Sequence, residues 1–170
     1  MSQSLLKFGN SLNIDKRLYK EDIAGSIAHV EMLFNQKIIS FKIKNKIIYG
    51  LSKIEKEISN KKFEFNQNYE DIHINIEKRL FQIIGEEAGY IHTGRSRNDQ
   101  VITDFKIWMR SSIKEISTLI NKLINSTLNL AAKNIDTIMP GFTHLKNAQP
   151  ISFAHYLMAY VEMFERDKKR

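Results

Sequence analysis

The chain has 170 residues, of which 42% are hydrophobic and 26% are charged, the balance of an ordinary soluble globular domain with room for a core. This composition excludes collagen-like and intrinsically disordered classes. The absence of cysteine excludes disulfides and thiolate metal sites, and two prolines and seven glycines favour a mostly helical fold.

The net charge of +7 suggests a polyanion partner, but Lys and Arg are spread along the chain and interleaved with Asp and Glu. We therefore expect no nucleic-acid partner. No window is apolar enough to span a bilayer, and residues 1–15 lack the continuous apolar stretch of a secretory leader. We expect a cytoplasmic protein that has no membrane partner.

Two helices are predicted before residue 60. Apolar residues recur at helical spacing over residues 16–34, and Asp22 lies in an early turn of that pattern. Residues 39–43 alternate like a strand, whereas the apolar positions of residues 47–58 step as one helix face. We predict a second helix over this stretch, with Ser40 as its N-cap.

A loop and a third helix follow. Residues 61–69 are polar and aromatic without a clear period, which predicts a loop. Asp71 is placed to cap a helix whose apolar face runs over residues 72–83 and ends before Gly85, a residue that suits a helix end. His73 lies on a different face from this apolar stripe.

The longest helical pattern begins at Asp99. Apolar positions recur at near-heptad spacing over residues 101–131, a length that is unusual for a globular helix and predicts a bundle or a coiled-coil-like core. Residues 134–147 break the pattern, and Pro150 is predicted to open a last helix that runs to Arg170. No Gly, Pro or Asn closes that helix, so we expect the chain to be truncated.

Residues 92–100 read His-Thr-Gly-Arg-Ser-Arg-Asn-Asp-Gln and concentrate hydrogen-bond donors around one glycine. The guanidiniums of Arg95 and Arg97 match carboxylates two bonds at a time, and Gly94 permits a backbone turn that is closed to other residues. The helix start that follows adds partial positive charge. The segment is suited to a dicarboxylate-sized anion; the alternative is an exposed basic loop capped by Asp99.

This segment resembles the signature of the argininosuccinate lyase family, and three other segments match that family in order and approximate spacing. They are Asn10-Ser11-Leu12, Glu70-Asp71-Ile72-His73, and Met139-Pro140-Gly141-Phe142-Thr143-His144-Leu145 with Ala148-Gln149-Pro150. Fumarases, aspartases and adenylosuccinate lyases share a Thr-His-type segment but differ over residues 94–100. The chain is therefore similar to the amino-terminal part of an argininosuccinate lyase.

The resemblance implies an all-α fold of the fumarase/aspartase type, here truncated. It places an amino-terminal helical domain with the active-site loop at residues 1–98 and the first helices of a long central bundle at residues 99–170. It also implies a homotetramer in which three subunits contribute to each active site. The family's loop with Gly-Ser-Ser and Met-Pro-x-Lys-x-Asn-Pro motifs does not occur, so we expect this chain alone to be inactive or nearly so.

The implied reaction is the reversible β-elimination of argininosuccinate to arginine and fumarate, a carbon-nitrogen (amidine) lyase step of arginine biosynthesis. His144 is the expected acid/base residue, because imidazole titrates near neutral pH and the resemblance aligns it with the family's catalytic histidine. The resemblance assigns substrate binding to Ser11, Asn98 and Thr143, with Arg95, Ser96, Arg97 and His92 beside them. One of the two arginines could instead brace the loop through an acidic residue.

No cofactor is implied, and the five histidines show no compact metal-ligand spacing, so no metal site is expected. His29, His73 and His155 are interpreted as structural, with His73 the main exception because it belongs to a matched motif. Two alternatives stand beside the lyase. The first, an enzyme that releases fumarate from another succinyl compound, is disfavoured by residues 94–100; the second is a non-catalytic remnant or structural scaffold of the same family.

Overall fold

The computed structural model describes residues 8–170, which form two compact units. The amino-terminal unit ends at Met109 and the carboxy-terminal unit begins at Arg110, both within one long helix. None of the helices in residues 8–170 carries an apolar stretch long enough to cross a membrane. The domain boundary expected between residues 98 and 99 stays a prediction.

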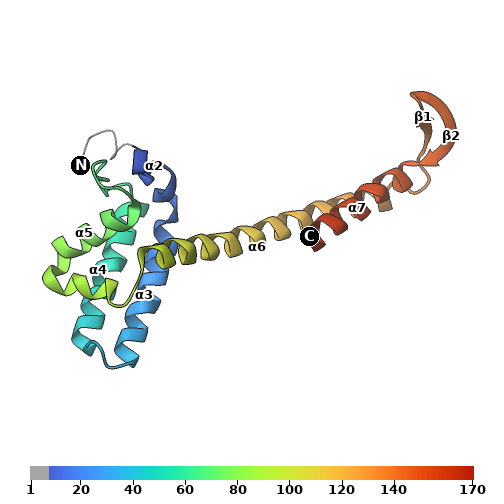
Figure 1. The fold of residues 1–170 in the computed structure, drawn as a ribbon. Coiled ribbons are helices and arrows are strands. Elements are labelled where there is room, and N and C mark those ends of the chain that lie inside the picture. The colour runs from blue at the N-terminus through green and yellow to red at the C-terminus, as the bar shows by residue number, and fades with distance from the viewer. Residues whose placement is uncertain (1–7) are drawn as a thin grey trace. The chain divides into compact units, whose positions relative to one another are not determined.

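Three packed helices dominate the amino-terminal unit (Figure 1). In chain order the unit contains α2 (Leu12–Asp15), the 3-10 helix η1 (Lys16–Leu18), α3 (Tyr19–Asn35), α4 (Phe41–Ser59), α5 (Ile72–Ile84), the 3-10 helix η2 (Gly85–His92) and the first part of α6 (Arg97–Ala132). α4 packs against both α3 and α5. The three helices and the loop predicted before Gly85 are confirmed.

Local capping sets the ends of α4 and α5. Ser40 Oγ accepts a hydrogen bond from the backbone N of Ile43 at 3.3 Å, and Asp71 Oδ1 accepts one from Ile74 at 2.7 Å. Gly85 follows α5 with φ of 81°, in the left-handed region that favours glycine. These predicted helix ends are confirmed, because each depends on residues within one helical turn.

The apolar faces of α3, α4 and α5 form the core of this unit. Its fully buried members include Val30, Leu33, Ile47, Leu51, Ile54, Ile72, Ile76 and Leu80. Gly50 allows α4 to approach α5 closely, because a Cβ atom at this position would overlap the side chain of Leu80 and lie 3.2 Å from Ile84 Cγ2. The core is therefore closely packed at this crossing.

Substitution of Gly50 by valine should destabilise the amino-terminal unit. The branched side chain would collide with Leu80, and overpacking of this kind costs about 1–3 kcal/mol of unfolding free energy. Urea denaturation measures the loss. Gly89→Ala is the matched control, since a Cβ atom there meets nothing within 4 Å and should change stability by less than about 0.5 kcal/mol. An unchanged midpoint for Gly50→Val would contradict the close approach of α4 and α5.

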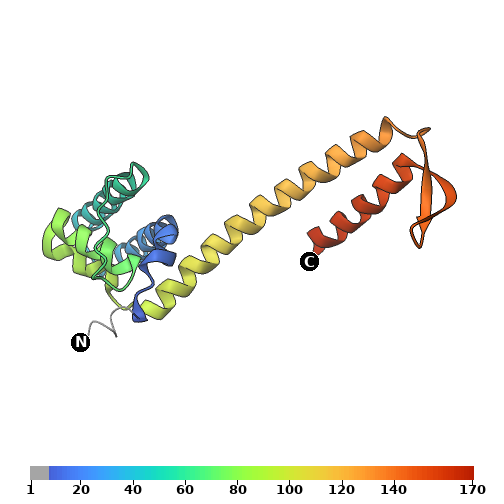
Figure 2. The ribbon, with the colours of Figure 1, turned by 90° about the horizontal axis from the view of Figure 1, so that it is seen from above.

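The carboxy-terminal unit combines helix with one β-hairpin. After the second part of α6 come β1 (Ile138–Thr143), β2 (Lys146–Ser152) and α7 (Phe153–Lys169). The strands are antiparallel, with Thr143 paired to Lys146, and their register shifts between Pro140 and Phe142. α7 then runs in the direction opposite to α6 (Figure 2).

Two expectations about this unit are wrong. The sequence patterns predict no strand, yet residues 138–152 form the hairpin. The last helix begins at Phe153, where Ser152 Oγ accepts a hydrogen bond from the backbone N of His155 at 3.1 Å, and not at Pro150. Pro150 lies in β2 opposite Pro140. Both strands of a two-stranded ribbon are edges, and edge strands tolerate proline.

The predicted long helix is confirmed by α6, and much of its apolar face is exposed. Ile113, Ile116 and Leu119 each keep more than half of their surface accessible, at 59%, 56% and 55%. Exposed apolar side chains also mark α7, at Tyr156, Met158, Tyr160 and Met163. Contiguous exposed apolar surface of this kind is typical of a helix face that binds another protein surface.

Candidate active site

Residues 92–100, termed the donor segment, connect η2 to α6 in the amino-terminal unit. Gly94 has φ of 63°, as the predicted turn requires. α6 begins at Arg97, and the backbone N of Gln100 donates to Ser96 O at 3.1 Å. Asp99 therefore lies inside the first helical turn and does not cap the helix. The end of α6 that carries partial positive charge is at Ser96 and Arg97.

The two arginines of the donor segment bind the protein's own side chains. Arg95 Nη1 donates to Ser26 Oγ on α3 at 2.9 Å. Arg97 Nη2 donates to Glu77 Oε1 on α5 at 2.8 Å, and its Nη1 donates to Gln100 Oε1 at 2.6 Å. Arg97 thus contacts an acidic residue, as a brace of the loop would. Substrate binding by either arginine stays a prediction.

Three other polar side chains of the donor segment face solvent, whereas Gln100 is buried. Ser96, Asn98 and His92 are exposed, and His92 Nδ1 lies 3.9 Å from Glu77 Oε1. The backbone of the donor segment is anchored at Thr93, because His29 Nε2 lies 3.0 Å from Thr93 O. Burial lowers the pKa of His29, so its neutral ring can donate to that carbonyl. The segment therefore presents exposed donors on a fixed backbone.

A second matched motif lies at the start of α2 and is tied to a third. Ser11 donates from its backbone N to Glu70 O at 2.9 Å and from its Oγ to Asp15 Oδ2 at 2.5 Å. Asp15 Oδ1 in turn accepts from the backbone N of Ile72 at 3.2 Å. The motif around Ser11 and the motif at residues 70–73 are thus joined. The role of Asp15 was not predicted from the sequence, where the one signal for it is its position one turn after Ser11.

Beneath the donor segment lies a buried cluster of Asp22, His73 and Asp104, termed the buried acid–histidine cluster. His73 Nδ1 lies 3.0 Å from Asp22 Oδ1 and 3.6 Å from Asp104 Oδ2. Gln100 Nε2 donates to Asp22 Oδ1 at 2.5 Å. Of these three residues, only His73 belongs to a matched motif. The available signal was a set of polar residues at inward positions of otherwise apolar helix faces.

Opposing effects set the pKa values in this cluster. Burial raises the pKa of Asp104 to about 7, and the nearby Asp22 charge adds to the rise. Burial alone would lower the pKa of His73, but its contact with Asp22 outweighs burial and the pKa is raised. Burial alone would raise the pKa of Asp22, but His73 and Gln100 outweigh it and the pKa is lowered.

These three groups are also the ones in residues 8–170 that lie close enough together to hold a metal ion, with ligand atoms within 4.8 Å of one another. Two carboxylates need positive charge nearby when both are ionised. Protonated His73 supplies one such charge. Arg95 supplies the other, since its charge acts on both Asp22 and Asp104. His73 of the cluster and the neighbouring Arg95 can therefore balance the charge of the two carboxylates.

The unfolding free energy should fall as the pH rises from about 5 to about 8. The folded-state pKa of Asp104, about 7, exceeds the unfolded value of about 3.9, so only the folded state holds this proton between them. His73, with a raised pKa, stabilises below about 6.5 and loses that contribution as the pH rises further. Asp22, with a lowered pKa, acts in the opposite sense, and only below about pH 4.

Urea denaturation at both pH values, on the wild type and on Asp104→Asn, measures this effect. The amide cannot ionise, so the variant should lose clearly less stability between about pH 5 and about pH 8 than the wild type. An identical pH dependence for the two proteins would contradict the assignment to Asp104.

Thr143 and His144 lie in the carboxy-terminal unit. His144 and Leu145 form the two-residue turn between β1 and β2, with φ of 48° and 63°. Positive φ at both positions is the geometry of a type I′ hairpin turn, which usually carries Asn or Gly. His144 and Thr143 are exposed. Left-handed backbone at a bulky Leu145 is strained, and such strain is concentrated at functional sites.

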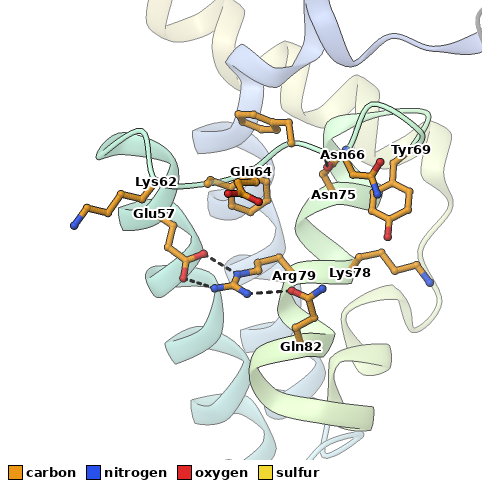
Figure 3. A pocket seen from close by; sticks show the side chains of 11 residues that line it. Glu57, Lys62, Glu64, Asn66, Tyr69, Asn75, Lys78, Arg79 and Gln82 are labelled. Carbon is orange, nitrogen blue, oxygen red and sulfur yellow. Dashed lines mark hydrogen bonds and ion pairs between the residues drawn. The ribbon is translucent and has the colours of Figure 1, made fainter.

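A cavity also lies next to the motif at residues 70–73, because its lining includes Tyr69 and Asn75. It measures about 540 Å³ and lies between α4, α5 and residues 62–69 (Figure 3). Arg79 on its wall binds Glu57 by two hydrogen bonds of 2.8 Å, and this contact lowers the pKa of Glu57. The guanidinium of Arg79 is therefore already paired with the Glu57 carboxylate.

A protein-family profile described as "Lyase" matches residues 2–170. The chain belongs to the lyase family. It is 74% identical to the argininosuccinate lyase of Pelagibacter ubique over 96% of its own length, and 54% identical to that of Ehrlichia chaffeensis over 99%. In both cases the chain spans 36% of the relative's length. The resemblance drawn from the four motifs is confirmed.

Comparison with solved structures supports the same fold. A variant of EDDS lyase with bound fumarate has a TM-score of 0.77 and 28% identity, over 89% of this chain and 29% of that one. A fumarate lyase from a Mesorhizobium species has a TM-score of 0.71 and 20% identity, over 90% of this chain and 36% of that one. The expected all-α class of the fumarase/aspartase type is confirmed, with one hairpin added.

Proposed function

We propose that the chain is the donor-bearing part of an argininosuccinate lyase of arginine biosynthesis, which cleaves argininosuccinate reversibly to arginine and fumarate. The observation that carries the proposal is the 74% identity to an argininosuccinate lyase across nearly the whole chain. The fixed backbone and exposed polar groups of the donor segment support it. The bound fumarate in the EDDS lyase variant fits the same class of product.

The proposed β-elimination determines which groups the active site must supply. A proton leaves the carbon beside one carboxylate of the succinyl part, and the bond from the neighbouring carbon to the guanidino nitrogen breaks. The electron pair departs with that nitrogen, which takes up a proton, so the products are fumarate and arginine. The site needs an acid/base pair and hydrogen-bond donors where negative charge accumulates. We assign His144 to the acid/base work.

The donors are assigned from what each side chain already contacts. Ser96 and Asn98 are exposed at the amino-terminal end of α6, where helix amides and dipole favour a carboxylate. Arg95 and Arg97 are engaged by Ser26 and Glu77. They would therefore act mainly by holding the segment and adding positive charge. Ser11, Thr143 and His92 complete the proposed substrate contacts.

We further propose a homotetramer in the cytoplasm, in which several copies of the chain contribute to each active site. The exposed apolar faces of α6 and α7 support this assembly, because water-exposed Ile and Leu in such number favour burial against partner helices. The site residues proposed here lie in two units of the chain, which also suits a site shared between copies. No cofactor is needed for this elimination.

A chimaera tests the function. This chain replaces the matching segment of the Pelagibacter ubique argininosuccinate lyase, and the gene is introduced into a bacterium that lacks its own lyase and requires arginine. Growth without arginine is the expected result. The chain alone should not support growth. A chimaera that accumulates as folded tetramer yet supports no growth would favour the alternative of a non-catalytic scaffold.

A further inference from the structure

The buried acid–histidine cluster is the least expected feature of the amino-terminal unit. Asp22 comes from α3, His73 from α5 and Asp104 from α6, and their side chains are 1%, 2% and 0% exposed. Three titratable groups at the junction of three helices are costly unless their charges are compensated. Nothing in the proposed elimination uses them directly, because they have no access to substrate.

The hydrogen bonds of the cluster are incomplete. Asp22 accepts from Gln100 and lies 3.0 Å from His73 Nδ1, but neither carboxyl oxygen of Asp104 has a well-aligned hydrogen-bond partner. A Cβ atom on Gly25 would lie 3.2 Å from Asp104 Oδ1 and 3.5 Å from Arg95 Nη2. Asp104 and Arg95 therefore converge over this glycine. A carboxylate that accepts no hydrogen bond in such a place is far more stable when it is neutral.

We propose that Asp104 is a positioning residue. Its carboxyl group stays protonated beside Asp22 and His73, and in this neutral form it fixes the position of the donor segment. The geometry connects the two. Gln100 belongs to the donor segment and binds Asp22, and Arg95 of the same segment and Asp104 both reach the space beside Gly25. With Asp104 neutral, a single carboxylate, Asp22, receives all the nearby donors. The consequence for catalysis rests on the proposed lyase function.

The charges that face Asp104 from each packed element agree with this arrangement. α3 contributes Asp22, α5 contributes His73 with Asp71 at its cap, and the donor segment contributes Arg95. Burial, and then the charge of Asp22, raise the pKa of Asp104 to about 7, against the opposing effects of His73 and Arg95. The proton is therefore lost around neutral pH. Two carboxylates then share the site and repel each other.

Nuclear magnetic resonance of the 170-residue chain tests the proton directly. The side-chain carboxyl carbon of Asp104, assigned with the Asp104→Asn variant, should titrate with a pKa near the value of about 7. In Asp22→Asn this pKa should fall by at least about one unit, because the neighbouring negative charge is removed. Asp99→Asn, on the exposed side of the same helix, should leave the titration unchanged.

Amide hydrogen exchange tests the positioning. After correction for intrinsic rates, the amides of residues 93–98 should exchange about tenfold faster once Asp104 is ionised. Asp104→Asn should abolish that pH dependence, since its amide keeps the shape of the neutral acid. A fold defect alone would raise exchange at every pH and in every helix. In the chimaera, KM for argininosuccinate should rise in parallel above neutral pH, with kcat less affected.

Three results would overturn the proposal. The first is an Asp104 carboxyl that titrates near the ordinary value of about 4. The second is an amide exchange rate over residues 93–98 that does not change when Asp104 titrates. The third is micromolar binding of Zn²⁺ or Mn²⁺ that requires Asp22, His73 and Asp104, which would make an ion the compensating charge. None of these depends on turnover, so failure here is distinguishable from failure of the lyase function.

Discussion

Replacement of His144 by asparagine in the chimaera should lower kcat by at least about 100-fold, the usual contribution of a general acid or base. Asparagine is the informative substitution because position 144 has φ of 48°. Asn tolerates the left-handed region better than most residues, so the hairpin turn should persist. The amide cannot exchange a proton near neutral pH. KM should change little, since substrate contacts are assigned to other residues.

Fumarate release, followed by ultraviolet absorbance, measures this effect. The matched control is His155→Asn, because His155 is exposed in the first turn of α7 and has no assigned chemistry. Its kcat should stay within about twofold of the parent chimaera. A chimaera with His144→Asn that keeps more than about a third of the parent kcat would remove His144 from the acid/base role.

Substitution of Asp22 by alanine should cost about 3–5 kcal/mol of unfolding free energy, the range measured when one partner of a buried ion pair is removed. The change would leave the Gln100 amide and protonated His73 without their shared acceptor. The positive charge of Arg95 would also lose the nearby negative charge of Asp22. Such a loss is a large fraction of the total stability of a typical domain.

Urea denaturation at about pH 6 measures this loss, and Asp99→Ala is the control. Asp99 is an exposed acid in the first turn of α6, and its removal should cost less than about 1 kcal/mol. If Asp22→Ala were as stable as the control, the ion pair with His73 would not hold α3 to α5. Such a result would also weaken the inference about Asp104.

The helices could be predicted where their signals are local. Ser40, Asp71 and Gly85 each act on backbone within one turn, so the ends of α4 and α5 follow from the sequence. The hairpin could not be predicted in this way. Pro150 suits the first turn of a helix as well as an edge strand, and the pairing that decides between them is tertiary.

In the candidate site, too, some residues could be predicted from the sequence and others depend on tertiary contacts. The donor segment and the Ser11 motif were identified by resemblance and by the donor chemistry of their side chains. What each arginine binds depends on Ser26 and Glu77, which are distant in sequence. Asp22 and Asp104 were missed for a related reason. An Asp side chain in a helix is usually interpreted as a capping or solvent-exposed residue. Its burial can be recognised only when its partners on other helices are known.

The most direct test of the lyase assignment is the rate at which the purified chimaera releases fumarate from argininosuccinate. We predict a kcat/KM within about tenfold of the Pelagibacter ubique parent, because the two sequences are 74% identical over 96% of this chain. A chimaera that assembles like its parent, binds argininosuccinate and releases no fumarate would contradict the lyase function proposed for this chain.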